Sequence, residues 1–323
     1  MDWGRNGCMT VSASNERRER TLLATGLDKS PQVVYSKYIT LGVQDPAKVA
    51  TYATITGPGL GFTTVGSPGT LKLLSVRALR TSPELAGKLG DYVDGLDTDG
   101  FQVCSNAAAT NFAPADTADC VANGARGNSW GVYNGTSGSA LDTLFATLNI
   151  TKGAVYTINV YGDDGWKAVN GQAGKTPIAT YTSTLDNLPL NAEAMAGTGV
   201  TADLFARVTM STKTQAEIAT AIRTKAAIST GLTWTVPGAT PDTRATALSY
   251  VGIYEEGQAN AAGAAWPASR KFDSSFPGPV ATSMTVNILA PAATLMVPTY
   301  AEFSLGYVNR NGNNIRSSYT FEQ

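Results

Sequence analysis

The sequence contains no histidine, and this absence removes the commonest general base and the commonest transition-metal ligand. Ser-His and Cys-His nucleophile pairs are excluded with it, so conventional hydrolases are disfavoured. The three cysteines include no C-x-x-C pair and are too few to form a four-cysteine zinc site. Together these absences predict that the protein is not an enzyme.

Charge is also scarce, since charged residues make up 15% of the 323 residues and the formal net charge is −1. No basic patch with interleaved aromatic residues occurs, which argues against binding to nucleic acid. No apolar run reaches the roughly 18 residues of a membrane-spanning helix, so we expect no transmembrane segment. The low charge and the many glycine, serine and threonine residues predict an extracellular or cell-surface protein.

Residues 1–32 form a polar segment that we interpret as an N-terminal arm. Its first eight residues lack the apolar core of a signal peptide, so we expect the reading frame to begin inside a longer one. The charged run Glu-Arg-Arg-Glu-Arg at 16–20 shows little periodicity. We therefore expect the arm to be loosely packed unless a partner orders it.

Period-two alternation of apolar and polar residues begins at Val33 and recurs along most of the chain. Such alternation is typical of half-buried strands, and Pro and Gly clusters end the runs. Strands expected at 33–41, 49–56, 71–79 and 154–161 predict a first β-sandwich over residues 33–185. A loop-rich excursion over 90–140 interrupts it, and loops of this length are usually functional.

Residues 186–227 differ, because a four-residue apolar spacing over 212–225 predicts a short helix with a Ser/Thr cap ahead of Gln215. We expect this segment to connect two domains. Alternation then resumes, and residues 228–323 are expected to form a second sandwich. The predicted fold class is mainly β, with two immunoglobulin-like β-sandwich domains and a short helical connector.

The C-terminal third carries a sequence of runs that resembles a known superfamily. These are Leu-Thr-Trp-Thr-Val-Pro at 232–237, Ser-Tyr-x-x-x-Tyr at 249–254, Phe-x-Leu-x-Tyr at 303–307, and a turn at 311–314. Their order is similar to that of fibronectin type III and related immunoglobulin-like domains. The resemblance implies that Trp234 packs in the core and that the last two strands meet at the Asn-Gly-Asn turn. The first domain resembles the same class more weakly.

Within the excursion, Cys104 and Cys120 lie sixteen positions apart. In an exported protein this spacing predicts a disulfide, with a thiol pair as the alternative. Asp94, Asp97 and Asp99 precede a glycine and present several carboxylates on a tight turn, as Ca²⁺ requires. The alternative is a solvated acidic turn, so calcium is the single cofactor that the sequence suggests.

Aromatic residues also lie in Gly- and Asn-rich stretches, where they are expected in loops. Trp130 and Tyr133 follow Arg126 in one such stretch, and Trp266 lies in another. Exposed aromatics at a sandwich rim can stack on sugars or anchor a protein partner. The alternative is that they cap the ends of the sandwich cores.

These observations predict a non-catalytic adhesion or ligand-binding protein that recognises a surface glycan or protein through the excursion. The second hypothesis is a structural subunit of a filament or surface layer, in which a strand such as Val33–Leu41 completes the sheet of another copy. The third is a glycan-active enzyme that uses two carboxylates and needs no histidine.

The cysteine assignment gives the first testable prediction. We expect Cys104 and Cys120 to be oxidised to each other, so that at most one thiol, that of Cys8, reacts with a thiol reagent on the folded, non-reduced protein. On the loop-entropy model the bond stabilises the fold by about 3 kcal/mol. Reaction of all three cysteines under these conditions contradicts the pairing.

Overall fold

The computed structural model describes residues 8–44, 49–60, 69–75, 100–103, 129–135, 138–162, 176–191, 205–234, 245–257, 271–275, 281–288, 298–309 and 312–323. Strands dominate these residues, so the prediction of a mainly β protein is confirmed. None of the described helices has the length and apolar character needed to cross a membrane.

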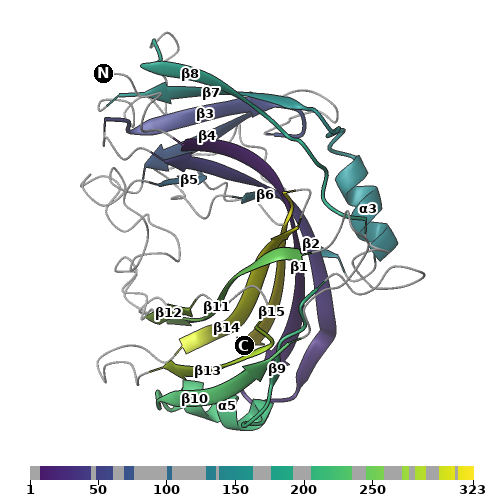
Figure 1. Cartoon of the computed structure of the whole chain (residues 1–323), viewed down its shortest axis with the longest axis vertical. Coiled ribbons are helices and arrows are strands. Elements are labelled where there is room, and N and C mark those ends of the chain that lie inside the picture. Colours follow the sequence, from purple (N-terminus) through teal and green to yellow (C-terminus); the bar gives the residue numbers. More distant parts are fainter. Residues whose placement is uncertain are drawn as a thin grey trace.

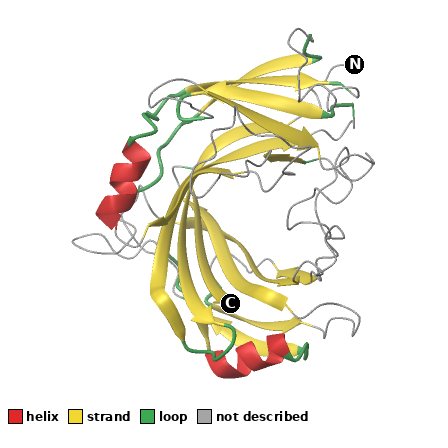
Figure 2. Ribbon diagram, turned by 180° about the vertical axis from the view of Figure 1, so that it is seen from behind, coloured by secondary structure: helices red, strands yellow, loops and turns green. Residues whose placement is uncertain are grey.

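The largest sheet is strongly curved and has seven strands (Figures 1 and 2). In spatial order these are β12 (Lys271–Ser275), β11 (Ala245–Gly257), β14 (Pro298–Asn309), β15 (Asn314–Glu322), β1 (Cys8–Leu22), β2 (Asp28–Gln44) and β6 (Ser129–Gly135). All neighbours are antiparallel except β1 and β15, which pair in parallel. Segments from both ends of the chain therefore share one sheet.

Two smaller sheets lie at opposite ends of the molecule (Figure 1). The five-stranded sheet consists of β5 (Phe101–Val103), β4 (Gly69–Ser75), β3 (Tyr52–Gly57), β7 (Val155–Tyr161) and β8 (Ala179–Thr184). The three-stranded sheet consists of β13 (Ser283–Ile288), β10 (Ile228–Thr233) and β9 (Thr209–Met210). Helix α3 (Gly138–Ala146) lies at the end of the molecule with the five-stranded sheet, and α5 (Gln215–Arg223) packs at the end with the three-stranded sheet (Figure 1).

The β1–β2 hairpin contributes to both hydrophobic cores. Near its open end, Val11, Ile39 and Leu41 pack against the five-stranded sheet. Near its turn, Leu23 joins the second core, which lies between the seven-stranded sheet, the three-stranded sheet and α5. Tyr35 contacts both cores from the middle of β2. One hairpin thus links the two ends of the molecule.

Strand β1 corrects one expectation, because its residues were predicted to be part of a loosely packed arm. Asn15 is fully buried and Glu16 and Arg17 are nearly so, with both long edges of the strand paired. The charged run looks aperiodic along the chain because neither face of the strand is apolar there. Its partners, β15 and β2, supply the burial that the local sequence does not indicate.

Two features of the C-terminal half, the cap of α5 and the core position of Trp234, agree with what the sequence predicted. Thr214 caps α5, as the sequence predicted, and Glu217 completes a capping box with it. Ile218 and Ile222 of this helix are buried against the second core. Trp234 is 5% exposed and belongs to the same core, so its predicted core position is confirmed.

The final hairpin also follows its sequence signal. Strands β14 and β15 pair antiparallel, and Gly312 between them has φ +78°, a conformation that glycine adopts without strain. The turn between β1 and β2 has a similar requirement at Gly26, where a Cβ would lie 2.4 Å from the backbone Cα of Ala216. This contact sets the hairpin turn directly on the first turn of α5.

The division into two immunoglobulin-like sandwiches is not confirmed. The seven-stranded sheet combines strands from the predicted arm, the predicted first domain and the predicted C-terminal domain. The predicted boundaries at residues 33, 186 and 228 remain predictions, but the sheet contains strands from three of the four segments that they separate.

Truncation of a buried side chain in the shared hairpin should show its contribution to the fold. Ile39 is fully buried in the first core, so Ile39→Ala should lower the free energy of unfolding by about 2–5 kcal/mol. Leu27→Ala, at a side chain that is 66% exposed in the turn of the same hairpin, should change it by less than about 0.5 kcal/mol. Urea unfolding of both variants measures the difference, and equal effects contradict the assignment.

Candidate functional site

A groove of about 670 Å³ lies between the seven-stranded sheet and the segment that leads into α5. Arg17 and Glu19 of β1 and Tyr319 of β15 line one side, and residues from Arg207 to Glu217 line the other. Small-molecule sites in proteins usually measure about 300–1,000 Å³. The groove therefore has the size of a ligand site, and we define it by these residues.

Strand geometry explains why these side chains meet. Arg17 and Glu19 are two positions apart on β1, so they point to the same side of the sheet. Their partners in the parallel ladder are Ser317 and Tyr319. Tyr319 accepts a hydrogen bond from Thr21 at 3.0 Å. Burial raises the pKa of this tyrosine to about 12, so it stays neutral at physiological pH.

Three cations and two carboxylates line the groove. The cations are Arg17, Arg207 and Lys213, and the carboxylates are Glu19 and Glu217. Glu19 accepts from Arg17 Nη1 at 3.0 Å.

Glu217 is already engaged in the cap of α5. It accepts from the backbone N–H and from the hydroxyl of Thr214 at 2.7 and 2.8 Å. These hydrogen bonds hold the pKa of Glu217 below its ordinary value, which keeps the carboxyl ionised. Both carboxylates of the groove therefore have hydrogen-bond donors of their own.

Arg17 is the most deeply buried charged group of the groove. Its side chain is 8% exposed, and Glu19 is its partner among the described residues. Its Nε is buried without a hydrogen-bond partner, as are the neighbouring hydroxyl of Ser317 and both amide atoms of Asn15. Leaving such a group unpaired costs about 1–3 kcal/mol. Of these atoms, Arg17 Nε is the one that belongs to a residue lining the groove.

Lys37 is another buried cation on the same face of the sheet as Arg17. It is 3% exposed, but it forms an ion pair with Asp142 of α3 and lies 5.8 Å from the centre of the Phe145 ring. Burial lowers the pKa of Lys37, while Asp142 partly opposes this shift. Lys37 thus has the anionic partner that stabilises a buried cation and ties α3 to β2.

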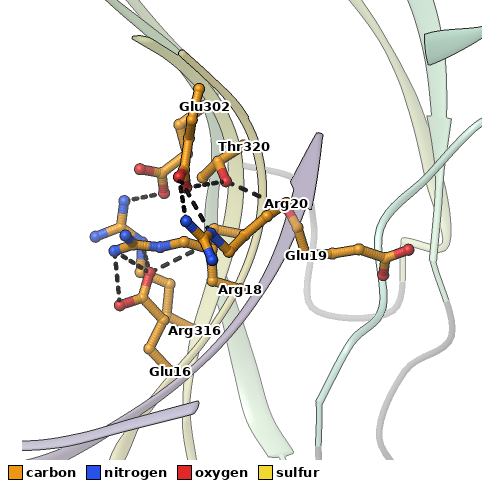
Figure 3. A network of polar contacts seen from close by, with 9 residues as sticks. Glu16, Arg18, Glu19, Arg20, Glu302, Arg316 and Thr320 are labelled. Carbon is orange, nitrogen blue, oxygen red and sulfur yellow. Dashed lines mark hydrogen bonds and ion pairs between the residues drawn. The ribbon is translucent and has the colours of Figure 1, made fainter. Parts of the chain in front are cut away.

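The opposite face of the same strands carries a separate ionic network (Figure 3). Arg18 donates to both oxygens of Glu16 at 3.4 Å, and Ser318 donates to Glu16 Oε1 at 3.0 Å. Arg316 forms an ion pair with Glu302. Figure 3 shows Glu19 pointing away from these residues, to the other side of the strand. The network joins β1, β14 and β15 through paired charges.

A second set of ion pairs secures the end of β15. Glu322 accepts from Arg20 at 2.9 Å and from Lys29 at 3.2 Å, and it also accepts from Thr320 at 2.8 Å. Burial raises the pKa of Glu322, but these donors outweigh it and hold the pKa below its ordinary value. Charges on this face are thus matched within the chain, which indicates a structural role.

Most of the predicted site residues lie outside the described residues. These are Asp94, Asp97, Asp99, Cys104, Cys120, Arg126 and Trp266. The calcium site and the disulfide therefore stay predictions. Among the residues that the structure does describe, no cluster of three or more potential metal ligands occurs.

Trp130 and Tyr133 are described, but they do not lie in a loop as expected. Both belong to β6, where Trp130 pairs with Ile39 of β2. The surrounding Gly and Asn residues suggested a loop, whereas pairing with β2 at the edge of the sheet gives this segment a strand conformation. A strand at a sheet edge can still present aromatic side chains to a partner.

The sequence analysis did not identify Arg17, Glu19 or the segment 207–217 as a site. A signal was present, because the charged run follows Val-Ser-Ala-Ser at 11–14, which alternates with period two. Continuing this alternation would have placed Arg17 and Glu19 on one face and Glu16 and Arg18 on the other. The groove itself could not be inferred, since its two sides come from distant parts of the chain.

Comparisons with known proteins give no assignment. No protein-family model matches the chain, and no curated protein matches its sequence. Among solved structures, the adhesin InvE of Yersinia pseudotuberculosis is 12% identical over 96% of this chain and 58% of that chain, with a TM-score of 0.15. CBD12 from CALX1.2 is 8% identical over 90% of this chain and 79% of that chain, with a TM-score of 0.14. The chain thus spans little more than half of the adhesin, and these scores assign neither fold nor function.

Acid stability should report on the ionic network. Burial by itself raises the pKa of Glu16, but Arg18, Arg316 and the hydrogen bond from Ser318 outweigh it, so the pKa lies below its ordinary value. Glu16 therefore stabilises the fold above about pH 4.3, the value of an unperturbed glutamate. This contribution is lost as the pH falls from there through the lowered pKa of the folded state.

We expect Glu16→Gln to lower the free energy of unfolding at pH 7 by about 3 kcal/mol, at the low end for breaking a buried ion pair because Gln still accepts a hydrogen bond. The variant should also lose less stability than the parent between pH 5 and pH 3. Part of the acid-induced loss should remain, because the pKa of Glu322 is lowered as well. The exposed Asp186 provides the control, and Asp186→Asn should keep the parental pH dependence. Urea unfolding at several pH values gives the comparison, and parallel curves for Glu16→Gln and the parent contradict the role of Glu16.

Proposed function

We propose that the protein is a non-catalytic, extracellular or cell-surface protein that binds a polar ligand in the groove between β1, β15 and the segment 207–217. The observation that carries this proposal is the buried Arg17, whose Nε has no partner although it lines a groove of about 670 Å³. Buried polar groups are almost always hydrogen-bonded, so an exception in a groove of this size favours a ligand. The low share of charged residues in the chain supports an extracellular or cell-surface location.

The state of the two groove carboxylates supports a binding role over a catalytic one. A glycosidase needs one carboxyl group whose pKa is raised so that it can donate a proton. The pKa of Glu217 is instead lowered by the bonds to Thr214, and Glu19 is held by Arg17. These contacts favour an ionised Glu217 and give both carboxylates a structural task.

Recognition through the aromatic residues of the excursion remains a second proposal. Trp130 and Tyr133 lie on β6, the edge strand of the seven-stranded sheet among the described residues. An edge strand can present side chains and backbone groups to a glycan or a protein partner. Assembly through addition of Val33–Leu41 is less favoured, because β2 is paired with β1 and β6 within the chain.

Binding measurements on an Arg17 variant test the proposal. Calorimetric titration with a panel of neutral and acidic monosaccharides, short oligosaccharides and inorganic anions should find saturable binding to the parent protein. Arg17→Met keeps the length of the side chain and removes its donors. It should weaken that binding about ten- to hundredfold, because hydrogen bonds to charged groups contribute about 1.5–3 kcal/mol.

Arg20→Met is the matched control, since Arg20 lies on the opposite face of β1 and pairs with Glu322. This variant should bind like the parent even where its stability is reduced. Trp130→Ala separates the two candidate surfaces, since its effect should be small if the groove is the site. Binding that survives Arg17→Met and is abolished by Trp130→Ala would overturn the groove in favour of the sheet edge.

A further inference from the structure

We infer that the groove receives an extended, uncharged peptide segment of a partner protein, which adds as a further strand to the edge of β9 that faces away from β10. This inference rests on the proposed function, because it names the class of ligand for the same groove. It depends on the backbone of β9 and not on a contact with the side chain of Arg17. Its support comes from the direction of the β9 hydrogen bonds, the lining of the groove and the state of its charges.

The backbone of β9 has polar groups that point away from its partner β10. In an antiparallel pair, successive residues direct their N–H and C=O groups alternately towards the partner strand and away from it. Ser211 donates its N–H to the carbonyl of Gly231 at 2.8 Å, so Ser211 faces β10. Met210 and Val208, one and three positions before it, direct their groups to the other side. Neither has a backbone hydrogen bond on that side among the described residues.

The register of β10 gives the same alternation independently. Met210 lies opposite Leu232, and the same register places Val208 opposite Trp234. Trp234 donates its N–H to the carbonyl of Thr282 at 2.9 Å, in the segment that leads into β13. Trp234 thus faces β13, and Val208 is not hydrogen-bonded to it. The outer edge of β9 therefore offers two N–H donors and two C=O acceptors in a row.

The groove lies along this edge. Every residue from Arg207 to Gln215 lines it, although successive side chains of an extended segment point to opposite faces. Such a continuous run indicates that the segment borders the groove with its backbone edge and not with one face alone. A volume of about 670 Å³ suits a single extended segment, whereas the edge strand of another folded copy would bring its neighbouring strands with it. This favours a linear segment of a partner protein over a second copy of the chain.

The charges that line the groove are engaged within the chain. Arg17 pairs with Glu19 at 3.0 Å, and Glu217 accepts from Thr214. Lys213 interacts electrostatically with Glu217, and Arg207 also has a partner. The groove therefore favours an uncharged ligand. An extended peptide repeats its donors and acceptors every two residues, about 6.8 Å, as the edge of β9 does, and the hydroxyls of a sugar do not share this repeat.

Backbone methylation of a bound peptide tests strand addition. The full chain is screened against a bead-bound library of octapeptides built from Gly, Ser, Thr, Asn, Val and Tyr, and the peptides that bind are titrated by calorimetry. Each N–H of the tightest binder is then methylated in turn. Methylation should weaken binding at least tenfold at alternate positions in the middle of the peptide and have little effect at the positions between, because only every second residue faces β9.

Met210→Pro provides the test on the side of the protein. Proline removes the N–H of Met210, which the ladder between β9 and β10 does not use, and edge strands tolerate proline at such positions. The variant should bind the same peptide at least tenfold more weakly than the parent. Thr285→Pro is the matched control at the opposite edge of the same sheet. Thr282 faces β10, so Thr285, three positions further on, faces away, and this variant should bind like the parent.

The possible outcomes separate this inference from the proposed function. Peptide binding without the alternation, or equally tight in Met210→Pro, overturns strand addition. Binding of a sugar or an anion in the groove, with no peptide bound, overturns the peptide and leaves the proposed function in place. Failure of both classes of ligand to bind counts against both. Dimerisation of the parent chain in analytical ultracentrifugation, lost in Met210→Pro, overturns the partner protein in favour of a second copy.

Discussion

The parallel pairing of β1 with β15 is the constraint on which the rest of the structure depends. It joins residues 14–22 to residues 314–322, so the strands at the two ends of the described chain lie side by side in the centre of the largest sheet. Parallel neighbours need a long connection, and here almost the whole chain forms it. Both cores and the groove are assembled around strands that this pairing brings together.

Successive side chains of β1 point to opposite faces of the sheet, so its charged residues fall into two groups with different surroundings. Glu16, Arg18 and Arg20 face one side, where carboxylates and guanidinium groups of β14 and β15 match them. Arg17 and Glu19 face the other side, where they line the groove and where Arg17 keeps an unpartnered donor. A buried ion pair contributes little net stability, but an incomplete one is costly. What distinguishes the two faces is the groove, which lies on the side of Arg17 and Glu19.

How far the sequence predicts this fold depends on the range of the interactions. Thr214 and Glu217 cap α5 within one helical turn, and Gly312 permits the turn between β14 and β15, so both elements were predicted from neighbouring residues. The charged run of β1 was misread because one of its two partner strands, β15, lies about three hundred positions away. Trp130 was misread for a similar reason, since pairing with β2 overrides the loop-like composition around it.

The sequence by itself determined the mainly β class, the helix at 215–223, the core position of Trp234 and the absence of histidine chemistry. Each of these follows from composition, period-two alternation or contacts within a few residues. Tertiary structure alone decided that both ends of the chain share one sheet, that Arg17 is buried, and that the segment 207–217 faces it. Strand partners and buried charges are set by contacts between distant segments, and no local pattern specifies which segments will meet.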